Sequence, residues 1–260
     1  MKGGLGALRD AFSFLTLLPV GRLPDQLLGG PERMCRAMAW FPLVGACLGL
    51  AAGWVVLLAG RGWASPLAAW AGLAALVILT GGLHLDGFSD TLDGMAAWGN
   101  REETLRVMQD SRLGGMGAVG LVLLLGFKGL ALAEVAPHDL LGALVASCSL
   151  SRLGLVISAQ SFPYVPGRDG LGRLATDRRS LGVLLWAVLL GAGFALAAVG
   201  PARAGICLGL AGLLCWGLNQ LFVARLGGIT GDTLGAVQEV METGLLLFLA
   251  MSHSADWVMR

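Results

Sequence analysis

Long apolar runs constrain the fold of this chain more than any other feature of the sequence. Residues 63–83 contain no charged side chain, and a helix needs about 20 mostly apolar residues to cross a bilayer. Seven runs are candidates, the last of them short: 37–60, 63–83, 118–136, 140–160, 181–200, 204–224 and 244–257. Only 13% of the residues are charged, against about 25% in soluble domains. The sequence therefore predicts an all-α, polytopic membrane bundle that forms a single domain over residues 1–260.

The connections between these runs alternate in character. Residues 61–62, 137–139 and 201–203 form short turns, whereas the other connections are longer and carry most of the ionisable side chains. By parity, the long connections share one face with the amino-terminal segment. Residues 5–20 are too short and too polar to span, which predicts an interfacial helix.

Positive charge indicates which face is cytoplasmic. The long connections carry Arg101, Arg106 and Arg112, while the short turns offer only Arg61 and Arg203. We therefore expect the polar mouth of the bundle to face the cytoplasm of a bacterial-type inner membrane, with lipid around the spans. The formal net charge of +1 gives no indication of nucleic-acid binding, and the oligomeric state is left open.

The first polar cluster follows the uncharged run directly. If this segment is helical, Asp86, Asp90 and Asp93 lie at i, i+4 and i+7 and share one face. Clustered carboxylates repel one another, and Mg²⁺ is a usual counter-ion for them. A solvated acidic face is the alternative, but no Lys or Arg occurs between Arg61 and Arg101. The pattern favours a metal site.

A second cluster lies near the carboxyl end. On a helix, Asp232, Glu239 and Glu242 would again share one face and could hold Mg²⁺ together with the first cluster. Thr230 and Thr233 precede these acids, and the sequence leaves open whether they cap the helix or hydrogen-bond a phosphate.

Positive charge lies between the two clusters. Asp110, Ser111 and Arg112 precede a glycine-rich turn, where an arginine can reach an anion at the membrane surface. Arg152 lies inside a span and must pair with an acid or with a phosphate. Lys128 is assigned a structural role, extending toward the interface or pairing with Glu134. The basic residues of segment 162–180 are typical of a positive-inside anchor, and a substrate lid is the alternative role for this segment.

Four of these segments together resemble one family. They are G-G-x-H-x-D-G-x-x-D-T-x-D-G at 81–94, D-S-R-x-G at 110–114, Ser-Arg at 151–152, and G-G-x-T-G-D-T-L-G-A at 227–236. In this order, and with F-L-T-x-L-P-V at 14–20, they resemble the cobalamin synthase family, the adenosylcobinamide-GDP ribazoletransferases. The resemblance covers essentially the whole chain.

The resemblance implies an enzyme of cobalamin nucleotide-loop assembly. Such a transferase joins the phosphate of adenosylcobinamide-GDP to a hydroxyl of α-ribazole or its 5′-phosphate, releases GMP and requires Mg²⁺. Asp86, Asp90, Asp93 and Asp232 would then surround the metal, with support from Glu239 or Glu242. Arg112 and Arg152 would hold phosphate oxygens. His84, or a carboxylate not fully engaged with metal, would accept the proton.

Two other functions are weighed against this one. The first cluster is also similar to the signature of the CDP-alcohol phosphotransferases, but its D-x3-D-x2-D spacing differs and the A-R element is missing after Asp90. A cation-coupled transporter would use intramembrane acids as an ion path. The acids here are grouped at one mouth rather than at mid-span, which argues against transport.

Overall fold

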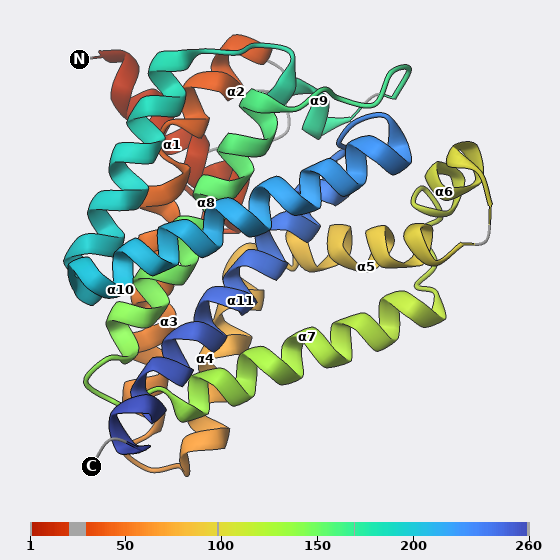
Figure 1. Cartoon of the computed structure of the whole chain (residues 1–260). Coiled ribbons are helices and arrows are strands. Elements are labelled where there is room, and N and C mark those ends of the chain that lie inside the picture. The colour runs from red at the N-terminus through yellow and green to blue at the C-terminus, as the bar shows by residue number, and fades with distance from the viewer. Residues whose placement is uncertain (1, 21–29, 98, 169, 259–260) are drawn as a thin grey trace.

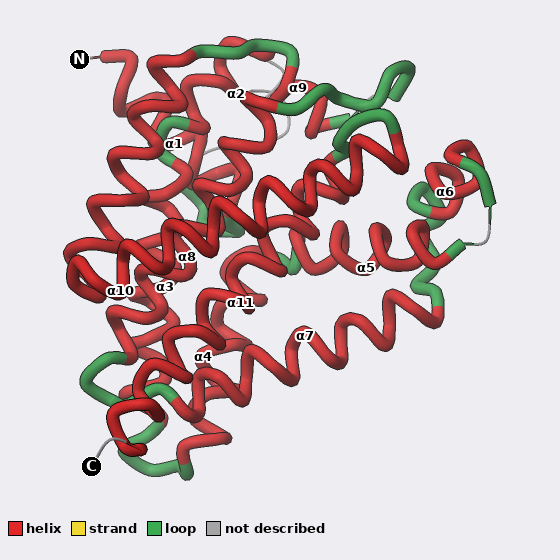
Figure 2. Tube along the Cα trace, viewed as in Figure 1, coloured by secondary structure: helices red, strands yellow, loops and turns green. Residues whose placement is uncertain are grey.

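The computed structural model describes residues 2–20, 30–97, 99–168 and 170–258. Within these ranges the regular elements are all helices, as predicted (Figure 2). They are α1 (Lys2–Leu15), α2 (Pro31–Met38), α3 (Phe41–Ala59), α4 (Ser65–Thr80), α5 (Leu83–Ala96), α6 (Arg101–Val107), α7 (Gly115–Glu134), α8 (Leu140–Ser161), α9 (Leu171–Thr176), α10 (Leu181–Leu226) and α11 (Gly231–Val258).

Five helices are long and apolar enough to cross a membrane: α3, α7, α8, α10 and α11, the last over Gly231–Met251. A sixth crossing is obtained if α4 and α5 count as one bent span. The 46 residues of α10 include both predicted runs 181–200 and 204–224, which join at a kink with non-helical dihedral angles at Gly200, before Pro201. The membrane character is shown, whereas the count of seven spans stays a prediction.

The short turns and the long polar connections lie at different sides of the bundle, as their alternation along the sequence predicts (Figure 1). The α3–α4 and α7–α8 connections lie at the lower left, and the bend of α10 lies at the left edge. Helices α1, α2, α6 and α9 lie along the upper and right sides. The polar connections therefore gather away from the short turns.

Helix α8 forms the centre of the bundle and is the most buried of the five candidate spans. Glycines of α3 allow the two backbones to touch: a Cβ added at Gly45 would lie 2.2 Å from the Cys148 carbonyl oxygen, and one at Gly49 2.3 Å from that of Leu144. Close approach through small residues is a general means of packing helices in membranes. The outer faces of α7 and α10 instead expose apolar side chains such as Val122 and Leu213.

A sharp turn positions α5. Gly81 and Gly82 both adopt left-handed dihedral angles (φ 64° and 69°), which cost glycine little. Helix α5 consequently lies at 92° to α4. The first acid cluster is thereby carried across the bundle rather than along the preceding helix.

Candidate functional site

The site begins where α5 crosses α11. A Cβ added at Gly87 would lie 2.9 Å from the Cα and carbonyl oxygen of Asp232, and one at Gly235 would lie 2.9 Å from the carbonyl oxygen of His84. Only glycine permits so close a crossing at these two positions. The crossing brings Asp86 and Asp90 of the first cluster next to Asp232 of the second, although they are far apart in the sequence.

These three carboxylates have little compensating charge around them. Asp86 is exposed, and Asp90 and Asp232 are partly buried. The negative charges of Asp86, Asp93 and Asp232 all act on Asp90. The nearest cation is Arg168, whose Nη2 atom lies 3.3 Å from Oδ2 of Asp232. We call Asp86, Asp90 and Asp232 the open acid site.

Two cavities adjoin the open acid site. The first, of about 580 Å³, is lined by residues that include His84, Tyr164, Arg168 and Asp232. The second, of about 850 Å³, is lined by residues that include Ser89, Asp90 and Ser111. Phe14, Leu83 and Asp86 belong to both walls. Asp86 therefore stands at the boundary between two separate spaces.

Asp93 lies on the predicted acidic face but is held elsewhere. Its carboxylate accepts hydrogen bonds from the backbone N–H groups of Gly114 (2.8 Å) and Gly117 (2.7 Å) at the start of α7. The amino terminus of a helix leaves such N–H groups without internal partners and attracts negative charge. Asp93 thus caps α7, whereas Asp86 and Asp90 line the second cavity.

Thr230 and Thr233 form a reciprocal cap at the start of α11. The Thr233 hydroxyl accepts from the backbone N–H of Thr230 (2.7 Å), and the Thr230 hydroxyl accepts from that of Thr233 (3.2 Å). Both side chains are fully buried, and neither lines the two cavities. Of the two roles left open by the sequence, the structure places these threonines in the capping one.

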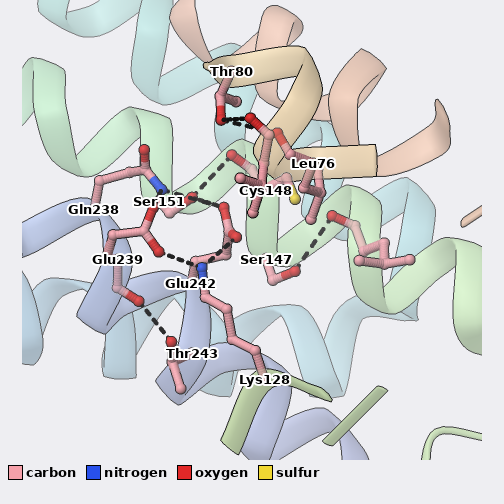
Figure 3. Close-up of polar contacts among 12 residues, drawn as sticks. Leu76, Thr80, Lys128, Ser147, Cys148, Ser151, Gln238, Glu239, Glu242 and Thr243 are labelled. Atoms are coloured by element: carbon pink, nitrogen blue, oxygen red, sulfur yellow. Dashed lines mark hydrogen bonds and ion pairs between the residues drawn. The ribbon is translucent and has the colours of Figure 1, made fainter. Parts of the chain in front are cut away.

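The two glutamates of the second cluster lie in a buried ionic group inside the bundle (Figure 3). Lys128 donates to Glu239 (2.5 Å) and to Glu242 (2.8 Å), and Arg152 pairs with Glu242. Gln238 and Ser151 also donate to Glu242. We call Lys128, Arg152, Glu239 and Glu242 the buried ion cluster.

The buried ion cluster decides between the alternatives that the sequence left open for Lys128 and Arg152. Lys128 neither extends toward the interface nor pairs with Glu134, because it is buried and contacts α11 instead. Arg152, for which a phosphate was an alternative partner, pairs with Glu242. Two cations and two carboxylates satisfy one another here, as charges inside a membrane protein must.

His84 lines the first cavity near the open acid site. Its side chain is buried, and Nδ1 has no hydrogen-bond partner. The residue comes from the first turn of α5, directly after the glycine turn that sets the direction of the helix. The residue therefore lines the cavity and keeps one buried imidazole nitrogen without a partner among the described residues.

The Asp110–Arg112 segment lies outside the bundle core. Arg112 is highly exposed and donates to Asp110 at 2.6 Å, so its guanidinium lowers the pKa of that carboxyl from 3.8 to about 2. Ser111 lines the second cavity, but Asp110 and Arg112 line neither of the two. Within this segment, the serine is the residue that reaches a cavity.

The fit of a metal ion depends on donor type and on position. Among the residues that the structure describes, no three His, Cys, Asp or Glu side chains are spaced to hold a metal ion. The three carboxylates of the open acid site nevertheless supply the hard oxygen donors that Mg²⁺ prefers, and they border the cavities. The fit is one of donor chemistry. It favours these three over Asp93, Glu239 and Glu242, whose oxygens accept short hydrogen bonds of 2.5–2.8 Å, whereas the contacts to Asp232 are 3.3 and 3.4 Å long.

The sequence alone indicates neither the contact of Arg168 with Asp232 nor the partners of Lys128. An arginine in a glycine- and proline-rich segment is equally typical of a surface anchor and of a site residue. Its contact with Asp232 becomes visible only in the fold. A lysine inside an apolar span is itself a signal of a buried partner. Its partners, however, are 111 and 114 residues away in the chain.

The comparisons with known proteins cover nearly the whole chain. Residues 7–250 match the family model described as cobalamin-5-phosphate synthase. An adenosylcobinamide-GDP ribazoletransferase of Klebsiella pneumoniae strain 342 is 41% identical over 92% of this chain and 96% of its own length. Relatives with the same name from Leptothrix cholodnii (37% identical, 91% of this chain and 92% of the relative) and Pseudomonas fluorescens SBW25 (36%, 93% and 98%) are similar. No solved structure matches the chain. With residues 7–250 matched by its model, the chain belongs to the cobalamin-5-phosphate synthase family.

Proposed function

We propose that this protein is an adenosylcobinamide-GDP ribazoletransferase. It transfers the adenosylcobinamide phosphate group to α-ribazole or α-ribazole 5′-phosphate and releases GMP. Membership of the cobalamin-5-phosphate synthase family and the shared name of its relatives support this reaction. The activity is that of a transferase acting on a phosphate-linked group.

The observation that carries the proposal is the meeting of two cavities at Asp86. A transfer between two large substrates requires a space for each and a common wall where the reacting atoms meet. The cavities share Phe14, Leu83 and Asp86, with Asp90 on one side and Asp232 on the other. This arrangement suits a donor and an acceptor that bind separately and react beside the open acid site.

The reaction forms one bond and breaks one. The ribose hydroxyl oxygen attacks the phosphorus that carries adenosylcobinamide, and the bond from that phosphorus to the bridging oxygen of the diphosphate breaks as GMP leaves. The hydroxyl proton passes to a base, and we assign this role to His84, which lines the first cavity with an unpaired Nδ1.

We further propose that Asp86, Asp90 and Asp232 hold Mg²⁺. When bound, the ion neutralises phosphate charge, which phosphoryl transfer requires. Asp86 and Asp232 line the first cavity, and Asp86 and Asp90 line the second, so the three carboxylates are accessible from the spaces where substrates would lie. Ser111, at the wall of the second cavity, is placed to hydrogen-bond a substrate.

The site is proposed to open to the cytoplasm from the inner membrane. The arginines of α6, of the α6–α7 connection and of the α8–α9 connection lie on the side that carries the site, while the opposite turns offer Arg61 and Arg203. A cytoplasmic mouth would give the enzyme direct access to water-soluble nucleotide substrates.

The experiment is a GMP-release assay with the detergent-purified protein. We expect release only when adenosylcobinamide-GDP, an α-ribazole acceptor and Mg²⁺ are all present, and we expect Asp86→Asn to abolish it. A CDP-alcohol with a lipid acceptor serves as the control substrate for the phosphotransferase alternative. CMP release with that pair, or ion-driven uptake into vesicles without product, would contradict the proposal.

A further inference from the structure

Arg168 lies against the open acid site although it belongs to the segment between α8 and α9. Its Nη2 atom lies 3.3 Å from Oδ2 of Asp232, and its side chain is only 11% exposed. The residue also lines the first cavity together with His84 and Asp86. A basic residue that only anchored the protein at the membrane surface would extend into solvent instead.

One end of this guanidinium lacks a partner. The Nη1 atom of Arg168 is buried and makes no hydrogen bond with the residues that the structure describes. A guanidinium carries five donors, and buried donors are nearly always satisfied. The contact with Asp232 is also longer than the 2.7–2.9 Å typical of charge-assisted hydrogen bonds. Arg168 therefore lines a cavity and keeps a buried donor unused beside it.

The backbone around Arg168 is held against the start of α11. Val165 donates to the carbonyl oxygen of Ile229 (3.0 Å), and Ile229 donates to that of Pro163 (2.8 Å). A Cβ added at Gly172 would lie 2.8 Å from the backbone nitrogen of Gly231. These contacts hold the backbone on both sides of the arginine, so the chain that carries the guanidinium is positioned before a ligand arrives, which lowers the entropy cost of binding.

The other two arginines considered for phosphate binding are engaged elsewhere. Arg112 is exposed and pairs with Asp110, while Arg152 is buried and pairs with Glu242. Arg168 instead combines a cavity position with an unpaired donor. Its planar fork matches two phosphate oxygens, which a diphosphate offers.

We propose that Arg168 binds the diphosphate of the nucleotide substrate in the first cavity, exchanging its contact with Asp232 for contacts with phosphate oxygens. This inference rests on the proposed function and adds a substrate-binding residue to it. The exchange also releases the Asp232 carboxylate from Arg168. Binding of the donor substrate therefore leaves the open acid site with a carboxylate that no longer pairs with the arginine.

The test compares binding and turnover in Arg168→Ala, Arg168→Lys and Arg178→Ala. Arg178 lies in the neighbouring α9–α10 connection, is exposed and lines neither cavity, so it controls for general loss of positive charge. Calorimetric titrations use GDP and GMP as probes. We expect Arg168→Ala to weaken GDP binding by about tenfold to a hundredfold and GMP binding much less, with Arg168→Lys between Ala and wild type. Arg178→Ala should match wild type.

Turnover separates failure of this inference from failure of the proposed function. In the GMP-release assay, Arg168→Ala should raise KM for adenosylcobinamide-GDP by a similar factor while KM for the α-ribazole acceptor changes little. Equal GDP affinity and an unchanged KM in a folded Arg168→Ala protein would overturn the inference, as would a wild-type protein that binds no GDP. If the wild type binds GDP through Arg168 but releases no GMP, the proposed function fails and the diphosphate site stands.

Discussion

The open acid site and the buried ion cluster contain acids from the same helix, but their surroundings differ. Asp232 lies at the start of α11 beside two cavities, with Arg168 as a weak partner. Glu239 and Glu242, further along α11, are buried and paired with Lys128 and Arg152. Carboxylates with unused oxygens at a cavity wall can act on a ligand, whereas carboxylates whose charges are cancelled inside the bundle hold helices together.

The largest expected effect is on activity at the open acid site. Asp232→Asn keeps the shape of the side chain but removes its charge, so we expect GMP release to fall by about a thousandfold or more. Thermal unfolding in detergent should occur at the same temperature or higher, because one of several crowded negative charges is removed. If the activity per folded molecule stays within tenfold of wild type, the open acid site does not differ from the buried ion cluster in the way described.

The buried ion cluster should show the opposite pattern. Glu242→Gln leaves Arg152 and Lys128 with one carboxylate between them, and breaking a buried pair costs about 3–5 kcal/mol. We expect a lower unfolding temperature but nearly unchanged activity in the protein that remains folded.

A double variant provides the control for that prediction. Arg152→Leu combined with Glu242→Leu removes both partners, and it should recover part of the stability lost in Glu242→Gln. A stable Glu242→Gln protein without activity would assign the cluster to the reaction and contradict the account.

Asp93 offers a smaller test between these two extremes. Asp93→Ala removes the acceptor for Gly114 and Gly117, so we expect a loss of about 1 kcal/mol in the free energy of unfolding, as for other helix caps. Asp93→Asn should lose less, because its amide oxygen still accepts. The Mg²⁺ concentration for half-maximal activity should stay at the wild-type value in both variants, and a large increase would return Asp93 to the metal site.

The smallest effect concerns the exposed pair Asp110–Arg112. Because Arg112 lowers the pKa of Asp110 to about 2 in the folded protein, the pair stabilises the fold above the ordinary carboxyl pKa of 3.8. This contribution is lost as the pH falls through about 2. Unfolding temperatures measured from pH 5 to pH 2 should therefore decline slightly less in Asp110→Asn than in wild type, and 1 M salt should remove the difference. An identical decline at low salt would show that the pair adds nothing.

The sequence predicted the class of fold and part of the site. The uncharged run at 63–83 and the other apolar runs indicate a helical membrane protein. The helical spacing of Asp86 and Asp90 places these two residues on one face of a helix. The same spacing could not separate Asp93 from them, because the N–H groups that hold it belong to another helix. Nor could spacing along α11 show that Asp232 reaches a cavity while Glu242 meets Lys128. Those outcomes depend on how helices cross, which a single sequence does not reveal.

The most direct test of the division between the open acid site and the buried ion cluster is a measurement of Mn²⁺ binding. The binding is monitored by electron paramagnetic resonance, with adenosylcobinamide-GDP present and the acceptor omitted. Mn²⁺ takes the oxygen ligands that suit Mg²⁺ and is itself paramagnetic. We expect wild type and Glu239→Gln to bind Mn²⁺ alike, and Asp232→Asn to lose that binding. Binding that survives in Asp232→Asn and disappears in a folded Glu239→Gln protein would show that the metal belongs to the buried ion cluster, contradicting the account.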